Sequence, residues 1–194
     1  MAVFADAERY TQAPPELPLL DQCIGGDQDA WRALHRQYFP IATAFLRRLG
    51  VREVDLEDAA QEVFVQVFRY LSRFRGEAEF RTWLYQLCIT QRRRMRRSYF
   101  VRDLLESVFL QKHPATLVSG PGFSEELAQR RLDAALAKLP EAERVVFVLY
   151  EMQNLSGPEI GAIVGAKPAT VWRRLHYARR SLQEALGLRV EDAP

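Results

Sequence analysis

The stretch that decides the fold is LSGPEIGAIVGAKPATVWRRL, residues 155–175. Within it, Ser156 and Glu159 have the spacing of a capping box at the start of a short helix. Gly165 can end that helix with a positive φ angle, and Pro168 can begin a second helix after a tight turn. Two helices joined by so short a turn predict a helix-turn-helix.

The second of these helices is apolar on one side and basic on the other. Residues 167–183 contain five basic side chains and no acidic one. A helix with such a face suits the major groove of DNA, where arginine can bind guanine or phosphate. An αα-hairpin with a solvated basic face is the competing interpretation. The apolar face of the helix expected at 168–186 holds Val171, Leu175, Ala178 and Leu182, and its outward side holds Thr170, Arg173, Arg174 and Tyr177.

The distribution of charge divides the chain of 194 residues into two basic blocks. Residues 16–102 hold 15 basic and 11 acidic side chains, and residues 128–190 hold 10 and six, so each block has a net charge of +4. Between them, residues 103–127 hold one basic and four acidic side chains, together with Gly and Pro. This pattern predicts two domains on a linker, each facing a polyanion, although two solvated surfaces would give the same charges.

Apolar residues at helical spacing predict helices in both blocks, and no stretch has the alternation of a convincing strand. The sequence therefore predicts an all-α fold of two small helical domains, 16–102 and 128–190, joined by the linker 103–127. The second domain contains the helix-turn-helix. The expected helices are 28–49 with a bend at Pro40, 56–73, a helix from 80 through the arginines, 127–138, 141–152, 158–164 and 168–186.

The helix expected at 56–73 combines an apolar stripe with a separate polar side. Ala60, Val63 and Val67 belong to the stripe. Polar residues clustered in this way can bind a partner without being needed for folding. The polar side is expected to hold Asp58, Gln61, Glu62, Gln66 and Arg69.

Aromatic residues and arginines are concentrated in the rest of the first block. Phe74 sits in a turn next to Arg75 and Gly76, and residues 92–97 include five arginines. An aromatic side chain on a loop beside such a helix can stack on an unpaired base while the arginines hold phosphates. Four other aromatic residues have the helical spacing that favours packing in a core: Phe64, Phe68, Phe80 and Trp83.

Together these segments resemble a bacterial sigma factor of the extracytoplasmic-function group of the sigma-70 family. Residues 55–64, DLEDAAQEVF, resemble the segment that grips the clamp helices of RNA polymerase. Residues 74–85 resemble the segments that melt and read the −10 promoter element, and residues 139–179 resemble region 4, which reads the −35 element. The resemblance covers about residues 28–98 and 131–186, and the order and spacing of the motifs agree in both blocks.

The resemblance implies a transcription initiation factor that binds core RNA polymerase through its clamp helices and flap, and also binds promoter DNA and an anti-sigma factor. It assigns polymerase binding to Asp58, Gln61, Glu62 and Gln66. It assigns −10 DNA binding to Phe74, Arg75, Gly76, Trp83, Thr90, Arg93, Arg94 and Arg97. It assigns −35 DNA binding to Thr170, Trp172, Arg173, Arg174, His176, Tyr177 and Arg180. Four of these positions depart from the family's usual residues, which affects the promoter sequence to be read: Thr90, Arg94, Trp172 and Arg173.

Other classes of function find little support in the sequence. Cys23 and Cys88 lie far apart in apolar settings and share no ligand spacing with the three histidines, so we expect structural thiols and no metal site. The chain lacks a phosphate-binding glycine loop and a set of nucleophile, base and acid, so we expect neither an enzyme nor a cofactor. It also lacks a secretory signal and a membrane span, so we expect a cytoplasmic protein without membrane insertion. A stand-alone helix-turn-helix regulator remains the alternative, but it would leave residues 58–97 without a function.

Overall fold

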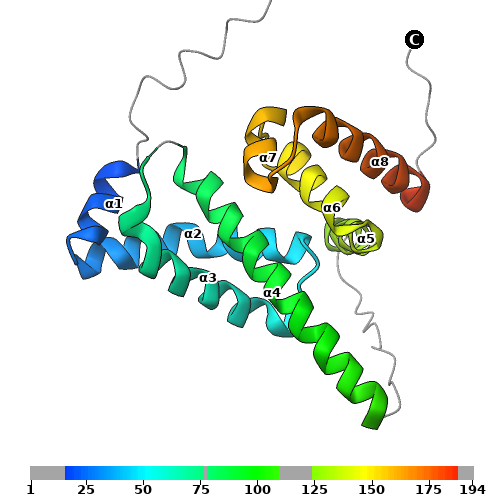
Figure 1. The fold of residues 1–194 in the computed structure, drawn as a ribbon, viewed down its shortest axis with the longest axis horizontal. Helices are drawn as coiled ribbons and strands as arrows, with labels where there is room; N and C mark the ends of the chain where they lie inside the picture. The colour runs from blue at the N-terminus through cyan, green and yellow to red at the C-terminus, as the bar shows by residue number, and fades with distance from the viewer. Residues whose placement is uncertain (1–15, 77, 110–123, 188–194) are drawn as a thin grey trace, which may run out of the picture.

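The computed structural model describes residues 16–76, 78–109 and 124–187, with side chains described for 16–76, 78–96 and 131–187. All of its regular elements within these ranges are helical, which confirms the predicted fold class (Figure 1). Within these ranges, none of the helices has the length and apolar character of a membrane span. The first half consists of α1 (Leu17–Ile24), α2 (Gln28–Arg48), α3 (Leu56–Tyr70) and α4 (Phe80–Phe109), with 3₁₀ turns at Glu53–Asp55 and Leu71–Arg73.

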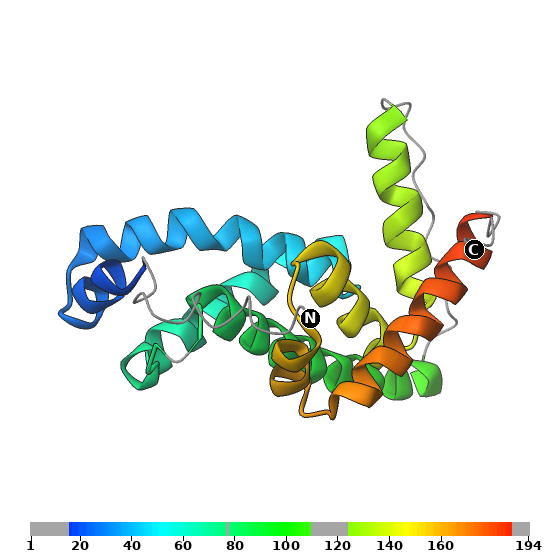
Figure 2. The same ribbon diagram turned by 90° about the horizontal axis from the view of Figure 1, so that it is seen from above.

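The first half is a bundle in which α2 lies along α3 and α4 (Figure 2). Asp27 starts α2, because its carboxylate accepts hydrogen bonds from the backbone N–H groups of Asp29 and Ala30. The helix continues through Pro40 to Arg48. The short helix α1, which the apolar spacing did not predict, packs against α2.

Three of the four aromatic residues expected to pack in the core are buried or half-buried, and the fourth is exposed. Phe64 and Phe80 are 8% and 0% exposed, and Trp83 is half-buried. Phe68, however, is 68% exposed, so its predicted burial was wrong. It lies near the end of α3, where its ring contacts Trp31 at a centroid distance of 5.1 Å and no further helix covers it among the described residues.

The second half contains α5 (Ser124–Lys138), α6 (Glu141–Phe147), α7 (Gly157–Val164) and α8 (Pro168–Leu186), and α6 continues into a π-helical turn, Val148–Met152. The local signals of the helix-turn-helix are confirmed. Ser156 and Glu159 form the capping box, Gly165 ends α7 with φ of 69°, and Pro168 begins α8.

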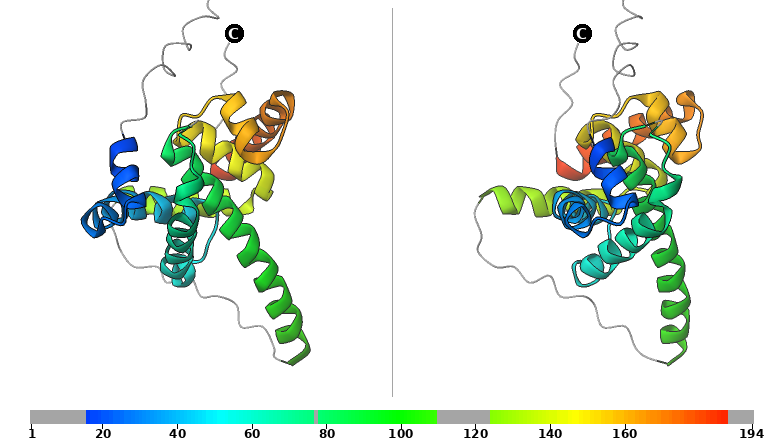
Figure 3. Two further views of the ribbon diagram at one scale, coloured as in Figure 1. Left: turned by 60° about the vertical axis from the view of Figure 1, so that its left-hand side comes forward. Right: turned by 90° about the vertical axis from the view of Figure 1, so that its left-hand side faces the viewer.

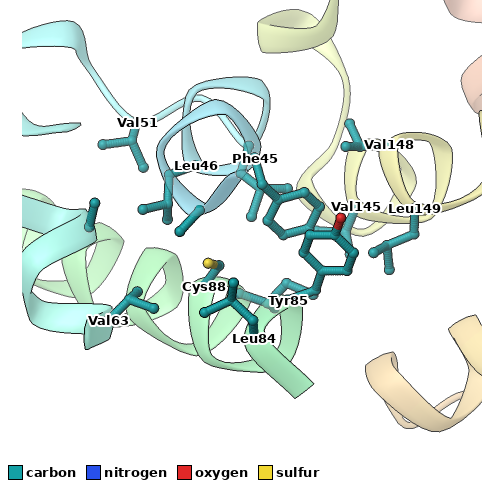
Figure 4. Packing of buried hydrophobic residues seen from close by; sticks show 14 of the residues in the cluster. Phe45, Leu46, Val51, Val63, Leu84, Tyr85, Cys88, Val145, Val148 and Leu149 are labelled. Atoms are coloured by element: carbon teal, nitrogen blue, oxygen red, sulfur yellow. The ribbon is translucent and has the colours of Figure 1, made fainter. Parts of the chain in front are cut away.

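The two halves share one apolar core. Phe45 of α2 and Tyr85 of α4 lie against Val145, Val148 and Leu149 of the second half (Figure 4). Burial raises the pKa of Tyr85 to about 12, so its phenol stays protonated and donates a hydrogen bond to Oε1 of Gln153. This contact joins α4 to the segment that precedes α7.

The predicted linker begins and ends in helix. The helix α4 extends to Phe109, and its C-terminal turns project away from the rest of the molecule (Figure 3). The helix α5 already begins at Ser124. Residues 110–123 lie outside the described residues.

Candidate nucleic-acid interface

A pocket of about 220 Å³ opens where the loop before α4 meets the first turns of that helix. Its aromatic wall consists of Phe74 and Trp83, whose ring centroids are 5.5 Å apart. Phe74 is half-buried because its ring also packs edge-on against that of Phe80, with 5.9 Å between the ring centroids. The pocket therefore combines aromatic faces with a basic and polar rim. Its lining residues are Arg73, Phe74, Arg75, Ala78, Thr82, Trp83 and Gln86.

The structure brings three of the predicted −10 residues to this pocket: Phe74, Arg75 and Trp83. Gly76 does not line it but shapes the loop, since its φ of 69° is a conformation that favours glycine. Thr90 lies one turn beyond the pocket on α4, where its hydroxyl donates to the backbone oxygen of Gln86 at 2.8 Å.

The arginines of α4 follow the pocket along the helix, but they do not share one environment. Arg93 and Arg94 are exposed. Arg92 turns inward, and its Nε donates to the backbone oxygen of Leu49 at 3.2 Å. Arg96 lies 3.2 Å from a carboxylate oxygen of Glu141 in the second half. The side chain of the predicted site residue Arg97 is outside those that the structure describes.

The outer side of α3 carries the polar residues predicted there, except one. Asp58, Gln61 and Glu62 are exposed. Gln66 is only 5% exposed and donates a hydrogen bond to Oε1 of Gln91 at 3.3 Å. The expectation that Gln66 lies on the polar side was therefore wrong.

The sequence contained a signal for this burial. Gln66 follows buried Ala59 by seven residues and buried Val63 by three, which places it on the stripe that faces α4. A buried amide needs a partner, and Gln91 on the opposing helix provides one.

The outward side of α8 presents basic and aromatic residues together. Tyr177 and Trp172 are 50% and 46% exposed, and the ring of His176 lies 5.7 Å from that of Tyr177. Arg173, His176 and Arg180 are also exposed, whereas Thr170 and Arg174 are half-buried. All seven residues predicted to contact −35 DNA therefore have some solvent-accessible surface.

Two neighbours of this surface were missed by sequence reasoning. The indole of Trp172 covers Gly157 at the start of α7, where an added Cβ would lie 2.8 Å from Cζ2 of Trp172. Tyr150 contacts the same indole at a centroid distance of 5.4 Å. The guanidinium of Arg179 lies over the ring of Tyr150 in a cation–π contact. The same guanidinium forms an ion pair with Glu151, with 2.6 Å between Nη2 and Oε1. In the sequence, only Gly157 inside the capping box hinted at a close contact there, and a glycine at a helix start can have several other structural reasons.

Comparison with known families gives two matches, one in each half of the chain. The family described as Sigma-70 region 2 matches residues 34–99, and the family described as Sigma-70, region 4 matches residues 129–182. The first match contains the pocket, α3 and the arginines of α4. The second contains the helix-turn-helix.

Whole-chain comparisons lead to the same family. The ECF RNA polymerase sigma-E factor of Escherichia coli is 31% identical over 178 residues, which cover 84% of this chain and 90% of that protein. The RNA polymerase sigma factor CnrH of Cupriavidus metallidurans is 28% identical over 176 residues, which cover 87% of this chain and 92% of that protein.

Two solved structures have a similar fold. CnrH in complex with the cytosolic domain of CnrY has a TM-score of 0.65 and 25% identity, and the match covers 88% of this chain and 96% of that one. The sigma factor RpoE in complex with the anti-sigma factor NepR from Bartonella quintana has a TM-score of 0.68 and 20% identity, over 81% of this chain and 97% of that one.

Proposed function

This chain belongs to the extracytoplasmic-function sigma factors of the sigma-70 family, and we propose that α4 with its pocket reads the −10 element while α8 reads the −35 element. The chain is a promoter-specificity factor of RNA polymerase. Membership in this family excludes the alternative of a stand-alone helix-turn-helix regulator.

The observation that carries the proposal for the −10 element is the aromatic pocket beside the arginines of α4. An unpaired base gains about 1–3 kcal/mol from stacking on an aromatic side chain, which offsets the few kcal/mol needed to extrude it from the duplex. Phe74 and Trp83 offer such faces, and Arg73 and Arg75 add positive charge at the rim. Arg93 and Arg94 lie farther along α4, where they can hold the phosphates of the same strand.

The proposal for polymerase binding rests on the exposed side of α3. Asp58, Gln61 and Glu62 are spaced three and four residues apart on one side of the helix, opposite its buried stripe. We assign this surface to the clamp helices of the polymerase. We assign the flap contact to the second half, and we place the protein in the cytoplasm with the polymerase. An anti-sigma factor is a further proposed partner, since RpoE of Bartonella quintana was solved with one.

Transcription with purified core polymerase tests the function. Core enzyme with this chain should give specific start sites on a library of genomic fragments, whereas core enzyme alone should not. The double variant Asp58→Ala/Gln61→Ala should leave helicity and melting nearly unchanged, weaken capture of core enzyme and reduce these transcripts.

A matched control is available on α1. Asp21→Ala/Gln22→Ala also removes one exposed acid and one exposed amide from a helix of the first half. It should bind core polymerase like the wild type. Equal affinity of all three proteins would exclude α3 as the polymerase surface, and absence of specific start sites with the wild type would overturn the function itself.

A further inference from the structure

Trp172 on α8 is exposed to solvent and is nevertheless fixed by contacts with two other elements. The residue is 46% exposed. Its indole covers Gly157 at the start of α7, and the ring of Tyr150 meets the indole at 76°, with 5.4 Å between the ring centroids. A side chain that is already fixed loses little conformational freedom when it binds a partner. Trp172 is therefore a preorganised contact on the surface of α8.

The contact with Gly157 determines which side of the indole is free. A Cβ added to Gly157 would lie 2.8 Å from Cζ2 of Trp172, 3.1 Å from Cε2 and 3.5 Å from Cη2. These atoms belong to the side of the indole that carries its N–H group, so this side is turned towards α7. The opposite side ends in Cε3 and Cζ3 and consists of carbon alone. The part of the indole that lies away from α7 is therefore apolar and offers no hydrogen bond.

The position of Trp172 along α8 is one from which base edges can be reached. Pro168 begins α8, so Trp172 lies at the beginning of its second turn. The N-terminal residues of the second helix of a helix-turn-helix contact base edges in the major groove. Arg173 and His176 are exposed beside the indole, and residues 167–183 include five basic residues and no acidic one. The cations can bind phosphates, whereas the uncharged indole is left to contact the bases.

Thymine is the base that suits an apolar contact in the major groove. It carries a C5-methyl group there, whereas guanine, adenine and cytosine present hydrogen-bond donors or acceptors. Carbon placed over such a polar group takes away its water without replacing the hydrogen bond, which is unfavourable. A methyl group, in contrast, gains free energy when it leaves water. A fixed carbon edge on α8 therefore favours thymine over the other three bases.

We propose that Trp172 selects one thymine of the −35 element, through contact between the carbon edge of its indole and the C5-methyl group of that base. The inference rests on the proposed function, because it takes α8 to be the helix that reads the −35 element. It adds that one position of the element is read by an apolar contact, beside positions that arginines read by hydrogen bonds.

Replacement of thymine by deoxyuridine tests this contact, because it removes the methyl group and keeps every hydrogen-bonding group of the base. The −35 motif is first selected from randomised promoters with wild-type holoenzyme, and each thymine of either strand is then replaced in turn. Wild-type holoenzyme should bind about three- to fivefold more weakly when one particular thymine is replaced, as expected for one buried methyl group. Unchanged affinity at every position, or a selected motif without an A·T pair, would overturn the proposal.

Two variants of α8 test whether Trp172 makes the methyl contact. Trp172→Ala should bind the thymine and uracil promoters equally well, because the apolar edge is gone. Tyr177→Ala is the matched control, since it removes an aromatic ring of similar exposure, 50% against 46%, from the same helix. It should keep the wild-type ratio of the two affinities. The wild-type ratio in Trp172→Ala would contradict the assignment to Trp172.

A gain of affinity makes the test independent of the folding of Trp172→Ala. Cytosine and 5-methylcytosine, each placed at the sensitive position, differ only by a methyl group at C5. Wild-type holoenzyme should bind the methylated promoter about three- to fivefold more tightly than the cytosine promoter. Equal affinity for these two promoters would speak against a methyl contact.

Arg173→Ala separates failure of this inference from failure of the proposed function. Arg173 is the exposed neighbour of Trp172 on α8. If Arg173→Ala changes the selected −35 motif while uracil has no effect at any position, the thymine contact is wrong and α8 still reads the element. If wild-type holoenzyme selects no −35 motif at all, the proposed function of α8 fails and this inference fails with it.

Discussion

The two helices that we assign to promoter reading, α4 and α8, present their aromatic side chains in opposite ways. On α4, Trp83 is half-buried and forms a pocket with Phe74 of the preceding loop. On α8, Trp172 and Tyr177 are about half exposed and stand on the outward side of the helix. The contrast matches two forms of DNA. An unpaired base needs a concave site that covers its face, whereas a duplex groove needs a protruding helix.

The largest expected effect comes from breaking the concave site. Phe74→Ala should bind core polymerase normally but reduce promoter opening by about tenfold or more, because the extruded base loses about 1–3 kcal/mol of stacking. Permanganate reactivity of thymines around the start site measures this opening.

Phe39→Ala is the matched control for this variant. Phe39 is also half-buried in the first half, but it packs against Phe64 at 5.6 Å and does not line the pocket. It should open promoters like the wild type. Opening by Phe74→Ala at the wild-type level would mean that Phe74 only packs against Phe80 and Trp83.

The next effect concerns the convex site. Arg173→Ala or Arg174→Ala should change the preferred −35 motif, because an arginine near the start of a recognition helix can reach base edges and contributes about 1–3 kcal/mol there. Arg173 is exposed and Arg174 is half-buried, so we expect the larger change from Arg173. Selection from randomised promoters with each variant holoenzyme measures the motif. An unchanged motif in both would assign the specificity to Trp172, to main-chain groups or to DNA shape.

The same two sites show what sequence can and cannot predict. The turn and the capping box of the helix-turn-helix were predictable because Ser156, Glu159 and Gly165 act within a few residues of one another. Phe74 was placed correctly in a loop because the neighbouring Arg75 and Gly76 interrupt the helical pattern locally. The contacts that its ring makes with Phe80 and Trp83, which turn the loop into a pocket wall, depend on how the chain folds back onto α4.

Errors arose where tertiary packing decides. Helical periodicity placed Phe68 in the core and Gln66 on the surface, and the structure reverses both. The spacing of Gln66 from Ala59 and Val63 indicated its burial, but Gln91, which accepts the hydrogen bond of the buried amide, lies on another helix and is not visible in a local pattern. The hydrogen bond from Nη1 of Arg144 to the backbone oxygen of Leu49 joins residues 95 positions apart, so it too was beyond local patterns.

A smaller effect should follow from changing the contact that supports α8. Gly157→Ala places a Cβ 2.8 Å from the indole of Trp172, so we expect it to lower the free energy of unfolding by about 1–2 kcal/mol. Denaturant unfolding of the full chain measures this loss. Trp172→Ala removes the clash, so the double variant Gly157→Ala/Trp172→Ala should be more stable than the sum of the two single changes predicts. Strict additivity of the changes in the free energy of unfolding would show that the indole of Trp172 does not contact Gly157 in solution.

The smallest effect is expected at Arg180, farther along α8. Its Nε lies 3.1 Å from Oε1 of Glu184, and both side chains are about two-thirds exposed, so the pair adds little to helix stability. Arg180 lies almost two turns after Arg173, beyond the base edges but within reach of a phosphate. Arg180→Ala should therefore weaken binding to all −35 sequences alike and reduce the salt slope of holoenzyme binding by about one unit. Glu184→Ala is the control, since it removes the pair but keeps the cation, and it should preserve the slope. A changed −35 motif in Arg180→Ala would contradict this prediction, because it would mean that Arg180 contacts base edges and not only phosphate.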